Sequence, residues 1–189
     1  MPANKLYLDA NELLLDSYRL GITILNSGFK PDYIVGIWRG GAPVGIAVQE
    51  ILHYLGVESD HIAIRTSSYY GIGKQDKIVR VHGLEYLLKN ISQGDNLLLV
   101  DDVFDSGRSV QAVINTLKKK ARRNTPDEIR IAVPWFKPNK NMTEITPDYY
   151  LHSTDDWLVF PHELDGLTEK EIFMNKPELE AIMKTYEKN

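Results

Sequence analysis

Residues 97–109 read LLLVDDVFDSGRS, and they are the strongest indication of the fold class of the chain. Four consecutive aliphatic residues are typical of a strand covered on both faces, as in a parallel sheet. Apolar residues then recur at helical spacing from Val110 to Leu117 and predict an amphipathic helix. The turn between them lies at the carboxyl end of a strand, where open α/β sheets bind ligands. The stretch therefore predicts an α/β fold with a ligand site at this turn.

The turn carries groups that suit a phosphorylated sugar. Ser106, Gly107 and Ser109 supply hydroxyls and backbone N–H groups at a helix N-terminus, which favours an anion. Asp101 and Asp102 precede them and suit sugar hydroxyls or a divalent cation. Helix capping alone explains one such residue, but not three carboxylates within five positions, which repel one another unless a cation or donor-rich ligand compensates. We therefore interpret the turn as a functional site.

This segment resembles the phosphoribosyl pyrophosphate binding motif of the type I phosphoribosyltransferases. The resemblance implies an open, mainly parallel sheet with helices on both faces, a small hood and a flexible loop. It also implies that Asp101 and Asp102 contact the ribose hydroxyls and Mg²⁺, the expected cofactor, while the next loop binds the 5′-phosphate. The residues of that loop are Ser106, Gly107, Arg108 and Ser109. The two serines stand where the family usually has threonine, and the arginine adds a charge within the loop.

Asp105 narrows the expected substrate. In family members that act on 6-oxopurines, an aspartate here assists proton transfer at purine N7, and the adenine and orotate enzymes lack it. The resemblance therefore implies a catalytic Asp105 and a purine salvage enzyme for hypoxanthine, guanine or xanthine. Its products would be a nucleoside 5′-monophosphate and pyrophosphate. Such acid–base work requires hydrogen-bond reach and a tuned pKa.

Residues 33–43 read YIVGIWRGGAP and predict a second strand that runs into a glycine-bearing loop. Gly40 and Gly41 permit close approach to a ligand, and Arg39 offers a fork of donors for phosphate oxygens. The loop resembles the family's pyrophosphate loop, which implies a catalytic role for Arg39 and adds Trp38 to the residues that bind the diphosphate. An ordinary strand-to-helix turn is the alternative, and the position before the main motif favours the functional interpretation.

Residues 65–77 read RTSSYYGIGKQDK, a polar stretch punctuated by glycine. Long irregular segments in compact domains are commonly lids or disordered loops. The stretch resembles a flexible loop of the family that carries a Ser-Tyr pair. Ser68 and Tyr69 match this pair, and the nearby Ser67 and Tyr70 leave a second register open. The alternative is a β-hairpin, and the two interpretations are compatible because a hairpin can carry a mobile tip.

Base recognition is expected in the last third of the chain. A strand over residues 130–136 is followed by Lys137, which resembles a family lysine that hydrogen-bonds the 6-oxo group. An ammonium group cannot accept a hydrogen bond from an amine, so a lysine here favours a base with an oxo group at position 6 over one with an amino group. The resemblance also implies that Trp157 stacks on the purine, that the Leu158 carbonyl faces its 2-substituent, and that Glu163 lies near the metal. The alternatives are a solvated lysine, a core tryptophan and a surface glutamate.

Composition agrees with one compact enzyme domain over 1–189, with its core at about 31–163 and a hood around 135–165. The net charge of −4 argues against a nucleic-acid partner, and the basic cluster 118–123 is explained by a solvated helix end. The absence of cysteine excludes disulfides and thiolate chemistry. No apolar run approaches the roughly 20 residues that span a bilayer, and no signal-type core follows the N-terminus. We therefore expect a cytoplasmic protein without a membrane partner.

The two ends resemble the family core least. Residues 11–25 predict a helix packed on the sheet, and residues 168–186 predict one or two helices separated by Pro177. The apolar residues at helical spacing in the first helix are Leu14, Leu15, Tyr18 and Ile22. Either end suits a hood that covers the base or a contact within a homodimer or homotetramer.

The expected ligands are phosphoribosyl pyrophosphate and a purine base. Two other functions remain open: a phosphoribosyltransferase for adenine or orotate, and a regulator that senses nucleotides on the same scaffold. A regulator would show a basic face or an appended DNA-binding domain. An inactive relative would show damage at Asp101, Asp102 or Gly107, and all three are present.

Overall fold

The computed structural model describes residues 5–70 and 77–186, which separate into two compact units. The larger unit contains residues 11–155, and the smaller contains both ends of the chain, up to Ala10 and from Asp156 onward. Each unit has its own sheet. The boundary falls inside the region that was expected to form the hood.

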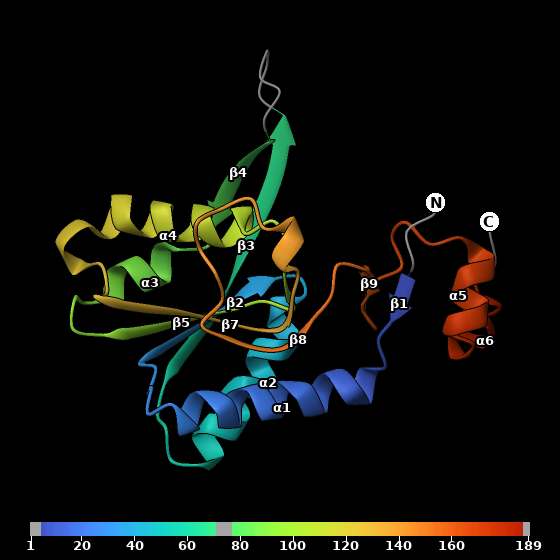
Figure 1. Cartoon of the computed structure of the whole chain (residues 1–189), viewed down its shortest axis with the longest axis horizontal. Helices are drawn as coiled ribbons and strands as arrows, with labels where there is room; N and C mark the ends of the chain where they lie inside the picture. The colour runs from blue at the N-terminus through green and yellow to red at the C-terminus, as the bar shows by residue number, and fades with distance from the viewer. Residues whose placement is uncertain (1–4, 71–76, 187–189) are drawn as a thin grey trace. The chain divides into compact units, whose positions relative to one another are not determined.

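The larger unit is built on a seven-stranded, mainly parallel sheet (Figure 1). Its strands are β2 (Tyr33–Trp38), β3 (Asp60–Tyr70), β4 (Lys77–His82), β5 (Asn96–Val100), β6 (Val103–Phe104), β7 (Glu128–Phe136) and β8 (Tyr149–Ser153). They lie in the order β4-β3-β2-β5-β7-β6, and β8 also pairs with β7. Only the β3–β4 pair is antiparallel among the described strands.

Helices cover both faces of this sheet. They are α1 (Ala10–Asn26), α2 (Gly41–Tyr54), α3 (Glu85–Asn90) and α4 (Arg108–Ala121), with short 3₁₀ helices η1 (Arg122–Asn124) and η2 (Pro138–Lys140). Figure 1 shows α3 and α4 on one face and α1 and α2 on the other. This is the predicted open α/β fold. The basic cluster 118–123 occupies the last turn of α4 and η1, as the helix-end interpretation requires.

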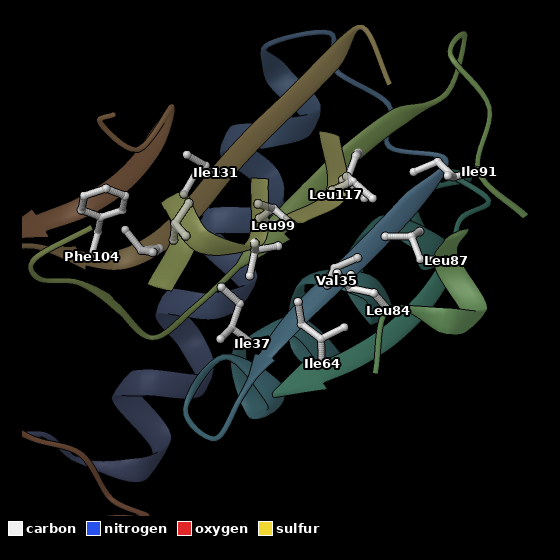
Figure 2. Close-up of a cluster of buried hydrophobic side chains, with 14 of the residues drawn as sticks. Val35, Ile37, Ile64, Leu84, Leu87, Ile91, Leu99, Phe104, Leu117 and Ile131 are labelled. Carbon is white, nitrogen blue, oxygen red and sulfur yellow. The ribbon is translucent and has the colours of Figure 1, made fainter. Parts of the chain in front are cut away.

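The central strands are apolar throughout because both of their faces are covered. All four aliphatic residues at 97–100 are at most 1 % exposed. Since side chains alternate along a strand, Val35 and Ile37 of β2 share one face, where they join the cluster that includes Leu117 of α4 (Figure 2). The two-sided burial predicted for β5 is therefore confirmed, and the acidic turn follows the carboxyl end of this buried central strand.

The helix predicted over residues 11–25 is confirmed, but its predicted packing face is wrong. Leu14, Leu15 and Ile22 are each more than a third exposed, and Tyr18 is half-buried. The buried face instead carries Leu13, Asp16, Ser17, Leu20, Gly21 and Ile24. Gly21 lies on the buried face because it allows α1 to approach α2 closely. A Cβ at this position would lie 2.3 Å from Ile51 Cγ2 of α2. A polar residue joins this face because the Asp16 carboxylate pairs with His152 at 2.7 Å.

The hairpin predicted around residues 65–77 is confirmed in the described strands. Ser68 lies opposite Val79 and Tyr69 opposite Ile78 in the β3–β4 pair. Residues 71–76, where the predicted flexible tip falls, lie outside the described residues. The flexible-loop role of Ser68 and Tyr69 stays a prediction.

The smaller unit joins the two ends of the chain. Strand β1 (Lys5–Tyr7) pairs in parallel with β9 (Trp157–Val159). Helices α5 (Glu169–Asn175) and α6 (Glu178–Met183) follow, and Pro177 separates them as predicted. In the part of the chain that the structure describes, no helix has both the length and the apolar character needed to cross a bilayer.

Candidate functional site

The two predicted anion loops meet at the carboxyl ends of β2 and β5, which are neighbours in the sheet. The Gly41 N–H donates a hydrogen bond to the Asp101 carboxylate. A Cβ at Gly41 would lie 2.4 Å from the Val100 carbonyl oxygen, and one at Gly40 would lie 1.7 Å from Asp102 Oδ2. Only glycine therefore permits the loop after β2 to lie against the two carboxylates.

Asp101 and Asp102 form a carboxylate pair that lies against the protein interior. Burial raises the pKa of the Asp101 carboxyl well above its usual range, and the charge of Asp102 raises it further. Hydrogen bonds from the N–H groups of Asp102 and Gly41 oppose this shift. Because two buried like charges are unfavourable alone, the pair suits a cation or a ligand rich in hydroxyl donors.

We expect Asp101→Asn to stabilise the ligand-free protein at neutral pH. The folded-state pKa is raised, so the contribution of Asp101 to stability is complete below its unfolded value near 3.8 and is lost as pH rises through the folded value. Removing the charge should therefore raise stability by about 1 kcal/mol, or ~2–4 °C in Tm, at the expense of ligand binding. Thermal unfolding of both proteins at pH 4 and pH 8 measures this. Equal Tm values at pH 8 would contradict it.

The predicted phosphate loop begins α4. Gly107 is its N-cap, with φ +73°, and no side chain caps the helix. The first backbone hydrogen bond of the helix runs from the Gln111 N–H to the Gly107 carbonyl at 2.9 Å. The N–H groups of residues 108–110 precede that bond and lack intrahelical acceptors. They open on a hollow of about 210 Å³ lined by residues 101–107, Ser109 and Val110, whose dimensions suit a phosphate and part of a sugar.

Residues 141–143, for which the sequence predicted no role, pack against this loop. The Met142 N–H donates to the Ser106 carbonyl at 3.1 Å. A Cβ at Gly107 would lie 2.5 Å from the Thr143 hydroxyl oxygen, so this residue packs directly on the loop. Asn141 Oδ1 holds Thr143 in turn, accepting from its N–H and its hydroxyl at 2.9 Å. Asn-Met-Thr signals a local turn, but nothing in that signal identifies residues 106–107 as its partner.

Trp38 and two arginines also lie at this edge of the sheet. Trp38 ends β2 with 54 % exposure, and Arg39 is exposed in the turn that follows. The Ala42 N–H donates to the Arg39 carbonyl at 3.1 Å and closes this turn. The half-buried Arg108 begins α4. The arginine side chains at this edge complement the two carboxylates in charge.

Lys137 and Asp105 lie together, although 32 positions separate them. Lys137 Nζ is 3.5 Å from Asp105 Oδ2. The lysine is only 8 % exposed, so its interpretation as a solvated residue at a strand end is wrong. It follows β7, and its N–H donates to the Phe104 carbonyl at 2.9 Å, which fixes the lysine beside the acidic turn. The Asp105 side chain is 52 % exposed and faces solvent at the mouth of the hollow.

The other predicted base-site residues belong to the smaller unit. Trp157 is 45 % exposed, so its interpretation as a core residue is wrong, while Leu158 is buried in β9. Glu163 Oε2 accepts from the Phe160 N–H at 3.4 Å, and its charge acts on Lys176. Glu163 therefore has local partners, and its metal role stays a prediction. Among residues 5–70 and 77–186, no three His, Cys, Asp or Glu side chains form a group able to hold a metal ion.

Comparisons with known proteins agree on one family. The chain matches the phosphoribosyl transferase domain over residues 4–165. It is 29 % identical to the bifunctional protein PyrR of Corynebacterium diphtheriae, over 75 % of each chain. Its fold is similar to the crystal structure of a purine phosphoribosyltransferase from Pyrococcus horikoshii, with TM-score 0.64, 29 % identity, and 88 % of this chain and 99 % of that chain covered. A xanthine-guanine-hypoxanthine phosphoribosyltransferase of Helicobacter pylori has the same fold, with TM-score 0.66, 19 % identity, and coverages of 96 % and 99 %.

Proposed function

Because the chain belongs to the phosphoribosyltransferase family and is a pentosyltransferase, we propose that its acceptor is a 6-oxopurine in purine salvage. The enzyme would transfer the phosphoribosyl group of phosphoribosyl pyrophosphate to hypoxanthine, guanine or xanthine. The similarity to a purine phosphoribosyltransferase from Pyrococcus horikoshii supports a purine acceptor. The choice of an oxopurine rests on one observation in this chain, the pairing of Lys137 with Asp105.

This pair matches one edge of an oxopurine. O6 and N7 are neighbouring atoms on that edge, and adenine presents an amine in place of O6. Lys137 Nζ and Asp105 Oδ2 are 3.5 Å apart, so the ammonium can donate to O6 while the carboxylate faces a proton on N7. An ammonium has no acceptor for the amine of adenine. The deep lysine and the exposed aspartate also give the two groups different roles, one in recognition and the other in proton transfer.

The reaction then depends on position and charge. Purine N9 forms a bond to ribose C1, the bond from C1 to the diphosphate oxygen breaks, and its electron pair leaves with pyrophosphate. The proton on N7 passes to the Asp105 carboxylate. Arg39 and the N–H groups at the start of α4 bind the anionic groups at the two ends of the sugar. Such preorganised donors stabilise charge that develops in the transition state.

The acidic pair fits Mg²⁺, the cation expected with phosphoribosyl pyrophosphate. The raised pKa of Asp101 beside Asp102 indicates a place where a positive charge relieves repulsion. These two carboxylates would hold the ion directly or through its waters, and the diphosphate oxygens would supply further ligands. When bound, the ion neutralises charge on the leaving diphosphate.

We expect Lys137→Met to weaken the use of oxopurines selectively. The variant loses a hydrogen bond from a charged donor to O6, worth about 1.5–3 kcal/mol, or roughly 10- to 150-fold in kcat/KM for hypoxanthine. The KM for phosphoribosyl pyrophosphate should stay within about twofold, because the Lys137 ammonium lies beside Asp105 and its proposed substrate partner is the base, not the diphosphate. Steady-state kinetics with each substrate varied in turn measures both. A parallel rise in the two KM values would contradict the assignment.

Identification of the product tests the proposed function. The protein is incubated with phosphoribosyl pyrophosphate, Mg²⁺ and one oxopurine at a time, and the nucleotide is identified by mass spectrometry. The expected result is a nucleoside 5′-monophosphate and an equal amount of pyrophosphate with at least one oxopurine. Formation of neither product with all three bases would refute it.

A further inference from the structure

The chain segment that follows β7 runs alongside the proposed phosphate loop, residues 106–109, within the larger unit. Two backbone hydrogen bonds join them. The Lys137 N–H donates to the Phe104 carbonyl at 2.9 Å, and the Met142 N–H donates to the Ser106 carbonyl at 3.1 Å. The segment therefore begins beside the lysine that is proposed to bind the base and ends beside the loop that is proposed to bind the 5′-phosphate.

Gly107, the N-cap of α4, lies in a close-fitting space between two side chains. A Cβ at this position would lie 2.5 Å from Thr143 Oγ1 and 2.8 Å from Cζ of the Phe104 ring. That ring is 1 % exposed and packs edge-on against Phe136, with 5.7 Å between the ring centroids, so it forms a fixed boundary. The position of the N-cap therefore depends on where the Thr143 hydroxyl is held.

Thr143 is held by the turn to which it belongs. Asn141 Oδ1 accepts from the Thr143 N–H and from its hydroxyl, each at 2.9 Å, and Asn141 Nδ2 donates to the Ile145 carbonyl at 2.8 Å. The Ile145 N–H donates to Thr143 Oγ1 at 3.3 Å. The Ile145 side chain packs against the buried cluster that includes Val110 and Val113 of α4. The turn is thus tied to the same hydrophobic core as the helix whose N-terminus it contacts.

The backbone of Gly107 directs the N–H groups that follow it. With φ +73°, this residue has a conformation that favours glycine. The N–H groups of residues 108–110 come next and lack intrahelical acceptors. A displacement of Gly107 turns these donors away from a bound phosphate.

We propose that Thr143 is a positioning residue for the 5′-phosphate. Its hydroxyl, bonded to Asn141, fixes Gly107 and with it the N–H groups that bind the phosphate. Thr143 acts through the loop and needs no contact with the ligand. The inference rests on the part of the proposed function that places the 5′-phosphate at this loop, and it does not depend on which base is used.

Two ligands separate the two ends of the substrate. Ribose 5-phosphate carries the 5′-phosphate without the diphosphate, and pyrophosphate with Mg²⁺ represents the leaving group alone. Thr143→Val keeps the shape of the side chain and removes the hydroxyl. Calorimetric titration should show its Kd for ribose 5-phosphate raised by about 2- to 10-fold, the factor for one hydrogen bond that holds the binding-competent conformation. Its Kd for pyrophosphate should change by less than about twofold, because a ligand that does not contact the loop is indifferent to its conformation.

Two further variants serve as controls. Thr143→Ser keeps the hydroxyl and should bind both ligands as the wild type does. Thr125→Val makes the same substitution beyond the C-terminal end of α4, where Thr125 Oγ1 donates to the Arg122 carbonyl at 2.7 Å. It should also bind both ligands with wild-type affinity.

Wild-type affinity for ribose 5-phosphate in Thr143→Val would overturn the proposal. An equal loss of affinity for both ligands would overturn it too, because it would indicate a general disturbance of the site. If the wild type binds no ribose 5-phosphate, the assignment of the phosphate loop fails, and this inference fails with it. If the wild type binds ribose 5-phosphate but uses no oxopurine, only the proposed acceptor fails, and the two titrations still decide the role of Thr143.

Discussion

Replacement of Asp105 with Asn is expected to lower kcat for an oxopurine by about 10²–10³-fold, the range for loss of a positioned general acid or base. The amide keeps the shape of the side chain but cannot take the N7 proton. Binding of phosphoribosyl pyrophosphate should change by less than about twofold, because Asp105 is half-exposed at the mouth of the hollow and its partner is Lys137. Steady-state kinetics and calorimetric titration with phosphoribosyl pyrophosphate measure the two effects separately.

Asp127→Asn is a suitable control for this experiment. Asp127 is an exposed carboxylate that immediately precedes β7, at the end of the strand opposite to Lys137. The two Asp127 carboxylate oxygens accept from Gln93 Nε2 at 3.1 and 3.2 Å. It should retain wild-type turnover. If Asp105→Asn turned over as fast as the control, the carboxylate would have no part in proton transfer.

We expect Gly41→Ala to abolish detectable binding of phosphoribosyl pyrophosphate and to destabilise the fold. Its Cβ would meet the Val100 carbonyl oxygen at 2.4 Å and Asp101 Cα at 2.8 Å. Both are backbone atoms of the central strand and its turn, so the β2–α2 loop must move away from the carboxylates. Overpacking of this kind costs about 1–3 kcal/mol, which lowers Tm by ~2–12 °C in a chain of this length. Thermal unfolding and calorimetric titration measure the two consequences.

Gly94→Ala is the matched control, because no atom lies within 4 Å of a Cβ at that position. The same methyl group should be tolerated there without loss of binding. Wild-type affinity in Gly41→Ala would mean that the two loops need not touch for the diphosphate to bind.

The parts of the fold that follow from local patterns could be predicted from the sequence. The aliphatic run at 97–100 identifies a strand buried on both faces because only such a strand excludes polar residues from both sides. Pro177 separates α5 from α6 because its ring does not fit a helix interior. The acidic turn and the Arg-Gly-Gly loop could be placed at one edge because each follows a strand of a parallel sheet.

The rest depends on contacts between distant positions, which no local pattern reports. Apolar residues on α1 lie on more than one side of the helix, and the close approach permitted by Gly21 decides which side is buried. For the same reason, no local pattern predicts that Lys137 pairs with Asp105 or that Thr143 packs against Gly107.

A competition assay tests the oxopurine assignment most directly, because product ratios from mixed substrates equal the ratios of kcat/KM. Hypoxanthine, guanine, xanthine, adenine, orotate and uracil are mixed at equal concentrations with Mg²⁺ and limiting phosphoribosyl pyrophosphate, and the nucleotides are quantified. We expect oxopurine nucleotides to make up nearly all of the product. A product dominated by the adenine nucleotide would mean that Asp105 accepts from the amine while Lys137 binds N7, and one dominated by a pyrimidine nucleotide would remove the base-site assignment altogether.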